Sequence, residues 1–331
     1  MKNILILSNT SDFHSDLLVR AAEARGYRCL RWNTDHERNV SDIDSDLPHD
    51  LVFRTGHKEM WSSDLDLVFI RRPLRSSSAQ GAGWLAEMLD DEWHGFEQGL
   101  IHLSSARVVN PASASTAARN KLLQIKLASE SGLAVPETLI STRRTTLAAF
   151  ADGGPVITKA VSYGGVPDGE HIRTGHTRLV TKEEILALDE RMTSPTLLQR
   201  RIPAAAMWRI VTIGERTFSF RLQGSALSEV ADSRFVETQL QGGPVPTPAG
   251  VEAGLVAMCR QLAISYASSD FIEDADGRLW FLDLNPDGQW AHYELTFGVP
   301  LSEHLVDLPA RRSRSAEIPP VAARRAVACP A

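Results

Sequence analysis

The sequence predicts a fold of two parts, a mostly parallel α/β layer over roughly the first hundred residues and an α+β body after it. In the first part, short apolar runs alternate with amphipathic helical stretches, a pattern typical of parallel strands joined by helices. Beyond residue 112, most extended segments are broken by Gly, Asp or Asn turns, as antiparallel hairpins are. The chain shows no internal repeat that would suggest another organisation.

Apolar periodicity places the elements of the first part. Strands are expected where four to six residues form an apolar run, and helices where apolar residues recur at helical spacing and stop at a residue such as Gly26. The acidic stretch 41–50 is expected to be a loop. On these grounds we predict strands over 2–7, 27–32, 65–73 and 107–111, and helices over 17–26 and 83–105.

The second part changes character at Ser113, where a helix with a serine and threonine start runs to a stop at Gly132. The segments after it are extended and end in turn residues. We predict helices over 113–132, 181–192 and 249–264, and extended segments over 155–170, 195–203, 208–224 and 268–286.

Composition excludes several classes of protein. The chain has 331 residues, is 43% hydrophobic and carries a net charge of −6, which is ordinary for a globular protein and gives no reason to expect nucleic acid binding. No apolar run is long enough to cross a membrane, and we expect a cytoplasmic protein. Three widely separated cysteines are expected to be reduced and unpaired. The tail 311–331, with five arginines against one glutamate, is expected to be flexible.

A possible metal site lies at the end of the run "FLDLNPDGQW". Asp283 and Asn285 are two apart, so in a strand they share a face. A hairpin turn over 274–277 would set Asp270 opposite Phe281 and on that same face, with Phe271, Trp280, Leu282 and Leu284 on the other. A tighter turn at Asp276 and Gly277 would shift the register by two residues and keep the same face. Three oxygen ligands of this kind suit Mg²⁺. The alternative, a solvated hairpin face, is favoured for Asp-x-Asn alone, and Asp270 shifts the balance toward a site.

Candidate phosphate ligands precede it. Lys159 lies inside a predicted strand, where a lysine is unusual, and Gly164 and Gly165 offer closely spaced backbone N–H groups. Lys121 lies on a predicted helix, where a solvated surface lysine is the simpler interpretation. The segment 199–202 ends an apolar strand and is a plausible hinge whose backbone could contact an adenine edge.

Three arginines complete the set, because a guanidinium fork suits a transferred phosphoryl group. Arg209 heads the strand "RIVTIG", and Arg221 and Arg234 lie in later extended segments. Surface salt bridging is the alternative, above all for Arg221.

The order of these features along the chain resembles that of proteins with the ATP-grasp fold. The features are the two lysines, the two glycines, the hinge, Arg209 and the Asp-x-Asn-Pro ending. "FLDLNPDGQW", the following "ELTFGVPL" and the earlier "FIRRP" resemble one branch, the graspetide (microviridin-type) peptide ligases, over the chain to about Leu308. The resemblance implies an α/β pre-ATP-grasp domain over 1–111 and an α+β ATP-grasp domain over 112–310. That domain would have a central part at about 135–200 and a C-terminal part at about 201–310.

The resemblance also implies a reaction. ATP would phosphorylate a side-chain carboxylate of a ribosomal precursor peptide carrying a leader, and a Ser, Thr or Lys side chain would attack the acyl phosphate to give an ω-ester or ω-amide. Carried onto this sequence, the resemblance assigns the phosphates to Lys121, Lys159, Gly164 and Gly165, and the border of the adenine to Gln199, Arg200 and Ile202. Mg²⁺ would be bound by Asp270, Asp283 and Asn285, and the phosphoryl group would be steadied by Arg209 and Arg234. The peptide would be contacted by Arg71 and Arg72.

The sequence departs from the family pattern in three places. Asp283 stands where the family usually has the longer glutamate, Met207 and Trp208 precede Arg209 where an aspartate is common, and Ser233 replaces an aromatic residue before Arg234. None of these changes removes a charge that the chemistry needs.

Two other functions stay open from the residues alone. A ligase for an amino acid or small carboxylate would use the same phosphate chemistry, although "FIRRP" and Gln289-Trp290 favour a peptide. A non-catalytic nucleotide- or peptide-binding module would be expected to lack a metal ligand or a lysine, and this chain has them. A homodimer is possible. For Arg71 and Arg72 the alternative role is to cap a helix or to pair with the acidic stretch 41–50.

Overall fold

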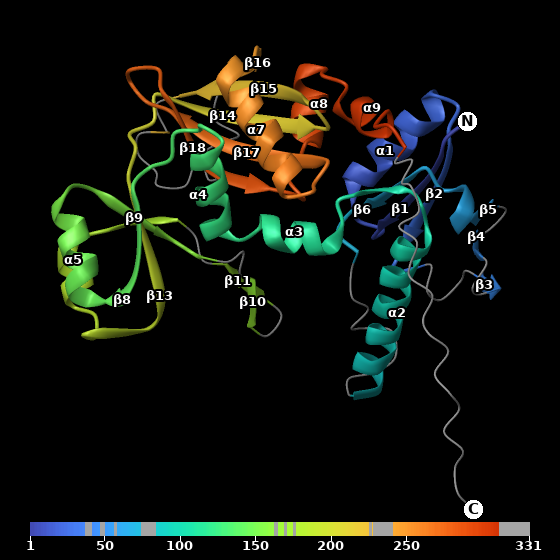
Figure 1. Cartoon of the computed structure of the whole chain (residues 1–331), viewed down its shortest axis with the longest axis horizontal. Coiled ribbons are helices and arrows are strands. Elements are labelled where there is room, and N and C mark those ends of the chain that lie inside the picture. Colours follow the sequence, from blue (N-terminus) through green and yellow to red (C-terminus); the bar gives the residue numbers. More distant parts are fainter. Residues whose placement is uncertain are drawn as a thin grey trace, which may run out of the picture. The chain divides into compact units, whose positions relative to one another are not determined.

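The computed structural model describes residues 1–36, 42–46, 50–55, 58–73, 84–161, 165–168, 171–174, 177–224, 227 and 241–310. Gly164 and Arg234 lie outside these residues. The chain divides into two compact units, one of Met1–Val108 with Val306–Ala331 and one of Val109–Leu305 (Figure 1). No described helix combines the length and the apolar character that crossing a membrane would need.

The first unit is built on a four-stranded sheet in the order β2-β1-β6-β7, in which β1 pairs in parallel with β2 and β6. The parallel α/β layer is therefore as expected. The helix α1 begins after Asp12, whose side chain accepts a hydrogen bond from the Ser15 amide at 3.0 Å. The elements are β1 (Asn3–Ser8), α1 (Phe13–Ala24), β2 (Arg28–Asn33), β6 (Leu67–Ile70), α2 (Trp84–Leu103) and β7 (Arg107–Val109).

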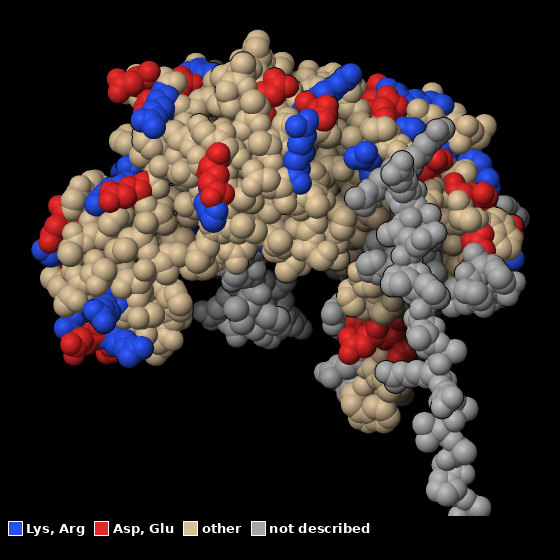
Figure 2. Space-filling model, viewed as in Figure 1, with Lys and Arg blue, Asp and Glu red and all other residues tan. Residues whose placement is uncertain are grey.

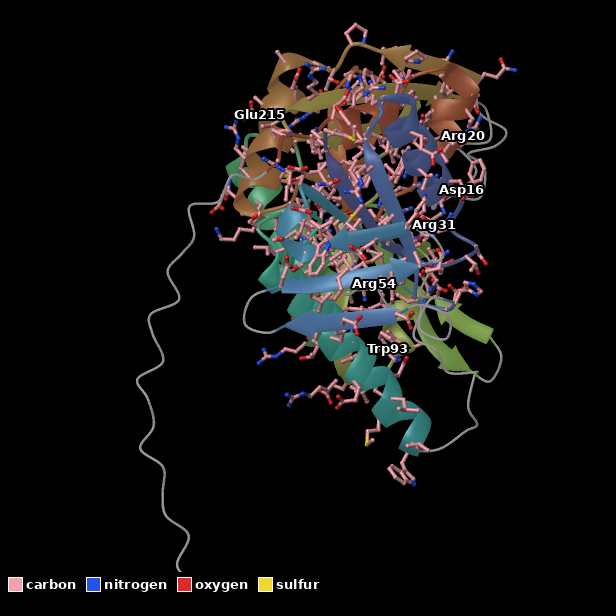
Figure 3. The ribbon with its side chains drawn as sticks, turned by 90° about the vertical axis from the view of Figure 1, so that its right-hand side faces the viewer. Asp16, Arg20, Arg31, Arg54, Trp93 and Glu215 are labelled. Carbon is pink, nitrogen blue, oxygen red and sulfur yellow. The ribbon has the colours of Figure 1, made fainter. Side chains whose placement is uncertain are left out.

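A second, three-stranded sheet in this unit corrects the expected loop at 41–50. β3 (Asp42–Asp46) pairs antiparallel with β4 (Asp50–Thr55), which pairs with β5 (Lys58–Trp61). Ile43 packs against the cluster that contains Trp32 and Phe53, while Asp42 and Asp44 beside it are exposed, so the strand alternates between core and solvent despite its acidic composition. Figure 3 shows Arg54, which pairs with Asp44 of β3.

The long helix α2 is strongly acidic. It contains five Asp or Glu residues and no Lys or Arg, and Figure 2 shows the red side chains gathered over it. Trp93 and Phe96 pack against the cluster of Trp32 and Phe53, and Glu97 is buried next to Phe96. The helix therefore faces the core at these residues, whereas Trp84, Leu85 and Met88 near its start are exposed.

In the second unit, the single helix expected over 113–132 is two helices, α3 (Ala112–Ala118) and α4 (Lys121–Glu130). Arg119 ends the first helix and Asn120 caps the second, because the Asn120 side-chain oxygen accepts hydrogen bonds from the Leu122 and Leu123 amides at 3.0 and 3.2 Å. Lys121 consequently occupies the first position of α4.

The first sheet of this unit has the order β12-β9-β13-β8. The helix expected over 181–192 is also wrong in length: the capping box of Thr181 and Glu184 starts α6, but the helix ends at Leu186 and strand β13 begins at Arg191. Pairing of β13 with strands on both sides outweighs the helical pattern of these few residues. The elements are β8 (Thr138–Arg143), α5 (Arg144–Asp152), β9 (Val156–Lys159), the hairpin β10 (Gly165–Asp168) and β11 (His171–Thr174), β12 (Arg178–Val180), α6 (Lys182–Leu186) and β13 (Arg191–Arg200).

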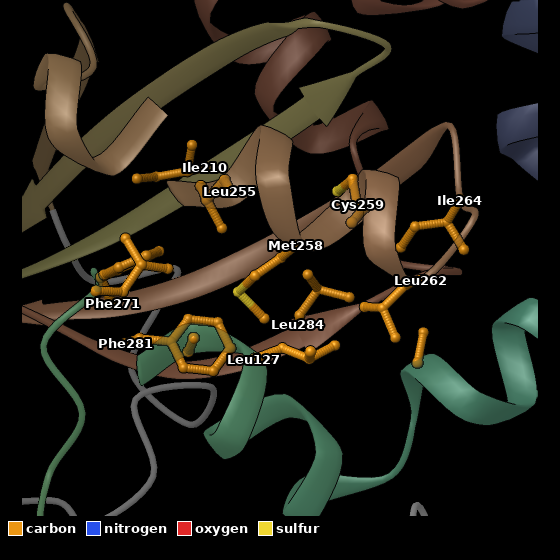
Figure 4. Close-up of a cluster of buried hydrophobic side chains, with 14 of the residues drawn as sticks. Leu127, Ile210, Leu255, Met258, Cys259, Leu262, Ile264, Phe271, Phe281 and Leu284 are labelled. Atoms are coloured by element: carbon orange, nitrogen blue, oxygen red, sulfur yellow. The ribbon is translucent and has the colours of Figure 1, made fainter. Parts of the chain in front are cut away.

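The second sheet is antiparallel throughout, in the order β16-β15-β14-β17-β18. Its apolar face packs against α7 and α4 in a cluster that includes Leu127, Met258 and Phe281 (Figure 4). The α+β architecture after residue 112 is therefore as expected. The elements are β14 (Ala206–Ile213), β15 (Arg216–Gln223), β16 (Gln241–Val245), α7 (Ala249–Gln261), β17 (Tyr266–Glu273), β18 (Leu279–Asn285), α8 (Ala291–Phe297) and α9 (Leu301–Val306).

Candidate active site

The β17–β18 hairpin sets two acidic side chains opposite each other, through a register that the sequence did not reveal. Phe271 pairs with Phe281, yet Asp270 pairs with Asp283, so the pairing skips Leu282. This extra residue is a β-bulge, which reverses the alternation of faces. The register that sets Asp270 opposite Phe281 is therefore wrong. The register of the tighter turn is confirmed for Asp270 and Asp283, and the bulge ends it at Phe271.

The bulge also settles which side chains fill the core. Phe281 and Leu284 are both buried, although they are three residues apart, and Trp280 and Leu282 are only partly buried. The expectation that Trp280 and Leu282 lie in the core and Phe281 on the acidic face is therefore wrong, whereas the burial expected for Phe271 and Leu284 is confirmed. Because the extra residue lies between Phe281 and Leu284, both can point inward while Asp283 keeps the outward direction.

Asp283 is paired with Lys121. The Lys121 ammonium contacts the carboxylate oxygen Oδ1, and the lysine side chain is 12% exposed against 34% for the aspartate. Lys121 is therefore not a solvated helix lysine, which was the simpler interpretation. The start of α4, created by the Asn120 cap, delivers this cation to the end of β18.

Asp270 is paired with Arg209 in the same way. The two residues are direct partners in the β14–β17 ladder, and Arg209 Nε lies 2.8 Å from Asp270 Oδ1. Arg209 also donates to the Ser268 hydroxyl at 3.3 Å, and its guanidinium lies 5.7 Å from the centre of the Tyr293 ring. Ser268 and Tyr293 were missed by sequence reasoning, since neither residue type carries a signal on its own.

Lys159 reaches the same place from the first sheet. It ends β9 and donates a hydrogen bond of 3.0 Å to the carbonyl of Leu282, the residue that the β17–β18 pairing skips. Burial, and next the neighbouring Lys121 ammonium, lower the pKa of Lys159 from 10.5 to about 8, while Asp283 and Asp270 act in the opposite direction. Two lysines, one arginine and two carboxylates thus meet where the two sheets adjoin.

The turn after β18 is fixed from several directions. Asn285 Oδ1 accepts a hydrogen bond from the Asp287 amide at 2.9 Å, and the Asp287 carboxylate pairs with Arg119. Gly288 lies so close to β17 that an added Cβ would be 2.3 Å from the Ser268 Cβ, so only glycine fits there. Asn285 is therefore held with its side-chain oxygen toward the turn.

Two buried amides hold the backbone on either side of Asn285. Gln124 of α4 donates to the Leu284 carbonyl at 2.8 Å and accepts from the Leu284 amide at 3.1 Å. Asn110 donates to the Pro286 carbonyl at 2.9 Å. Neither residue was singled out from the sequence, because the contacts span more than 150 positions along the chain.

The residues assigned to the adenine side lie at the end of β13. Gln199 is buried and donates to the Thr138 hydroxyl at 2.8 Å. Arg200 donates to the carbonyls of Gly154 and Phe150 at 2.8 and 2.7 Å, so the Gln199 side chain is engaged by β8 and the Arg200 side chain by α5 and the turn after it. Only the backbone here, and the partly buried Ile202, could face a nucleotide, and that role stays a prediction.

Arg71 and Arg72 belong to the first unit and differ in burial: Arg71 is buried and Arg72 is exposed. Arg71 is buried with its Nε 3.7 Å from Asp12 Oδ1, and burial, followed by the Arg71 charge, lowers the pKa of His14 to about 3. Arg72 is exposed and has a φ of 48°, a conformation rare for a residue with a side chain, and its carbonyl accepts a hydrogen bond of 2.7 Å from Asn9. Arg71 therefore pairs with the residue that caps α1.

The remaining arginine and glycine candidates have simple outcomes. Arg221 makes two hydrogen bonds to Glu273, at 2.7 and 3.0 Å, which confirms the salt-bridge alternative for this residue. Gly165 begins β10. Among the described residues no three His, Cys, Asp or Glu side chains gather as a metal cluster, so a cation here would rely on Asp270, Asp283 and the Asn285 amide.

Comparison with solved structures bears on the fold of the whole chain. The macrocyclase MdnC of Microcystis aeruginosa MRC, solved with the precursor peptide MdnA, is 23% identical, with 93% of this chain and 99% of MdnC covered and a TM-score of 0.79. An ATP-grasp ligase of Chryseobacterium gregarium, RiPP-associated and solved with ADP and a leader and core peptide, is 18% identical, with 95% and 99% covered and a TM-score of 0.83. The macrocyclase MdnB of the same Microcystis strain is 23% identical, with 93% and 98% covered and a TM-score of 0.72.

No protein-family model matches this chain, and no curated protein does. At identities below one quarter, the likeness to solved structures bears on the fold alone. The chain has the ATP-grasp fold, preceded by the parallel α/β layer, as expected from the sequence.

Proposed function

We propose that this protein is an ATP-dependent ligase that activates side-chain carboxylates of a ribosomal precursor peptide as acyl phosphates and closes ω-ester or ω-amide rings. The observation that carries the proposal is the meeting of Lys121, Lys159 and Arg209 with the opposed carboxylates of Asp270 and Asp283. Cations for phosphate and oxygen ligands for a metal are the two requirements of phosphoryl transfer.

The donor set fits a magnesium nucleotide. Asp270, Asp283 and Asn285 would hold Mg²⁺, which prefers a few carboxylate ligands together with phosphate oxygens and water. When bound, the metal would supply electrostatic neutralisation of the transferring phosphoryl group. Lys121 and Lys159 would bind phosphate oxygens of ATP, and both lie within reach of the metal carboxylates.

Arg209 is proposed to steady the phosphoryl group in transit. Its position is fixed by Asp270, Ser268 and Tyr293, so it would not need to reorganise when negative charge spreads over the transferring oxygens. Arg234 is proposed for the same role, and Gly164 and Gly165 for covering the phosphates. The backbone of 199–202 is proposed to contact adenine.

A peptide substrate is supported by two kinds of observation. MdnC was solved with its precursor peptide, and the Chryseobacterium ligase with a leader and core peptide, and each is similar to this chain over more than nine tenths of its length. Arg72 is exposed beyond β6, at the carboxyl edge of a parallel sheet, where α/β proteins usually bind ligands. We propose that Arg72 contacts the peptide and that Arg71 supports it from inside the unit.

The two other functions have weaker support. A non-catalytic module would be expected to have lost a charged ligand, whereas Lys121, Lys159, Asp270 and Asp283 are all present and in contact with one another or with adjacent backbone. A ligase for a free amino acid would share the phosphate chemistry, so substrate tests must separate it. We further propose that the protein acts in the cytoplasm, where precursor peptides are made, and as a possible homodimer without nucleic acid or membrane partners.

The test is mass spectrometry of a small peptide encoded beside the gene after incubation with the protein, ATP and Mg²⁺. Each ring closed would subtract the mass of one water, and ADP should form in equal amount. An unmodified peptide, together with ADP formation driven by a free amino acid, would replace the proposal with the amino-acid ligase.

A further inference from the structure

Both carboxylates of the candidate metal site are already paired with cations of this chain. The Lys121 ammonium contacts Asp283, and Arg209 lies 2.8 Å from Asp270. The two cations come from different elements, α4 and β14, and all four side chains are at most about one third exposed. The ligands that Mg²⁺ would need are thus held by competing positive charges.

Counting charge at this site makes the competition explicit. Lys121, Lys159 and Arg209 contribute three positive charges, and Asp270 and Asp283 contribute two negative ones, so these five side chains sum to +1. The nearby pair of Arg119 and Asp287 is neutral as a whole. A site with this balance repels a divalent cation and attracts a polyanion, and the effect is strong because the groups are partly removed from water.

Lys121 differs from Lys159 in what it touches. Lys121 contacts a carboxylate oxygen of Asp283, whereas Lys159 donates to the backbone carbonyl of Leu282. Of these two lysines, therefore, Lys121 is the one that occupies an oxygen that a metal would require. The Lys121 side chain is a flexible chain of four methylene groups, so its ammonium can move from Asp283 to a phosphate oxygen without movement of α4.

We propose that Lys121 acts as a resident counter-cation that keeps Asp283 from binding metal until a nucleotide arrives. The triphosphate draws the Lys121 ammonium away from Asp283, and the freed carboxylate then takes the metal that accompanies the nucleotide. The site is thus loaded by the nucleotide first, or by both together, and not by the metal alone. This inference rests on the proposed function, because it assumes that Asp283 is a metal ligand and Lys121 a phosphate ligand.

The experiment measures binding of Mn²⁺, a spectroscopic substitute for Mg²⁺, by electron paramagnetic resonance without nucleotide or peptide. The protein is compared with Lys121→Met, Lys159→Met and Lys126→Met. Lys126 lies on the same helix and pairs with Glu130 at the surface, so its loss controls for α4 itself. Lys159→Met removes an equal charge from the same site without freeing a carboxylate, and so controls for general repulsion.

We expect Lys121→Met to bind Mn²⁺ at least about tenfold more tightly than the unaltered protein. Lys159→Met should gain clearly less, and Lys126→Met nothing. Adding Asp283→Ala to Lys121→Met should remove the gain. Equal gains in Lys121→Met and Lys159→Met would overturn the inference in favour of simple repulsion, and tight Mn²⁺ binding by the unaltered protein, or none by Lys121→Met, would also overturn it.

A second measurement separates this inference from the proposed function. Calorimetry with a non-hydrolysable ATP analogue, with metal removed by a chelator, should show binding to the unaltered protein, since the site carries a net positive charge without metal. Loss of nucleotide binding under every condition would reject the ligase, but the difference in Mn²⁺ affinity between Lys121→Met and Lys159→Met would still report whether Lys121 occupies Asp283.

Discussion

Lys159 should lower the stability of the fold that it serves. Its ammonium is mostly removed from water and lies near a second ammonium, so its pKa falls from 10.5 to about 8. That difference corresponds to roughly 3 kcal/mol of free energy against the charged form. The hydrogen bond to the Leu282 carbonyl returns about 1 kcal/mol, and partial exposure of the side chain reduces the penalty further.

Replacing Lys159 by methionine keeps most of the side-chain volume and removes the charge. We therefore expect Lys159→Met to raise the free energy of unfolding by about 1 to 2 kcal/mol at neutral pH. The same variant should bind a non-hydrolysable ATP analogue more weakly, by roughly 1.5 to 3 kcal/mol, because a charge-assisted phosphate contact is removed. A gain in stability together with a loss of binding is what a residue retained for function should show.

The pH dependence has a definite sign. The folded-state pKa is lowered, so the penalty is present in full below pH 8, and it disappears as the pH rises from about 8 toward 10.5, where the unfolded chain also releases its proton. The stability advantage of Lys159→Met should therefore shrink over that interval. Urea unfolding followed by circular dichroism at pH 7 and pH 9.5 measures it, with Lys126→Met as a surface control. A Lys159→Met protein that is less stable than the original at pH 7 would refute the reasoning.

Three further predictions concern the turn, the metal ligands and the arginines. Asp283→Ala and Asn285→Ala should abolish ADP formation while the thermal midpoint stays within a few degrees, because both side chains lie outside the core; unchanged turnover in either would remove it from the ligand set. Gln124→Leu should lower the free energy of unfolding by roughly 2 to 4 kcal/mol, since the Leu284 amide and carbonyl lose buried partners, and an unaltered urea midpoint would contradict this. Arg71→Ala should destabilise the first unit by roughly 3 kcal/mol, because the buried Asp12 carboxylate loses its positively charged partner. Arg72→Ala should leave stability and ATP binding intact and reduce ring closure. Normal ring closure by Arg72→Ala would reject the peptide role of Arg72.

The sequence predicted the acidic face of the hairpin and, with the tighter turn, the pairing of Asp270 with Asp283, but not the change of register beside it. The pairing of Asp270 with Asp283 depends on a one-residue bulge at Leu282, and alternation of residue types cannot reveal an inserted residue. The two-helix start of the second unit was more accessible, because Asn120 is a good N-cap in the middle of the expected helix. A solvated side chain was the simpler prediction for Lys121, because the expected single helix gave no sign that a second helix starts at this residue. That helix start brings Lys121 to Asp283.

Contacts between distant segments lay beyond sequence reasoning altogether. Gln124 and Asn110 hold the backbone around Asn285 from more than 150 residues away, and neither amide has a spacing signal. Arg71 and Arg72 could not be told apart by sequence, because Arg71 is buried through its contact with Asp12 at the start of α1 while Arg72 is exposed, and the residue type is the same.

Transfer of oxygen from the peptide to phosphate tests the central claim, activation of a carboxylate by ATP, most directly. A precursor peptide whose Asp and Glu carboxylates carry heavy oxygen would be incubated with the protein, ATP and Mg²⁺, and the released inorganic phosphate analysed by mass spectrometry. If an acyl phosphate forms and is then attacked by a side chain, each ring closed leaves one heavy oxygen in phosphate, with ADP as the other product. Phosphate without the label, or release of AMP and pyrophosphate, would contradict the account.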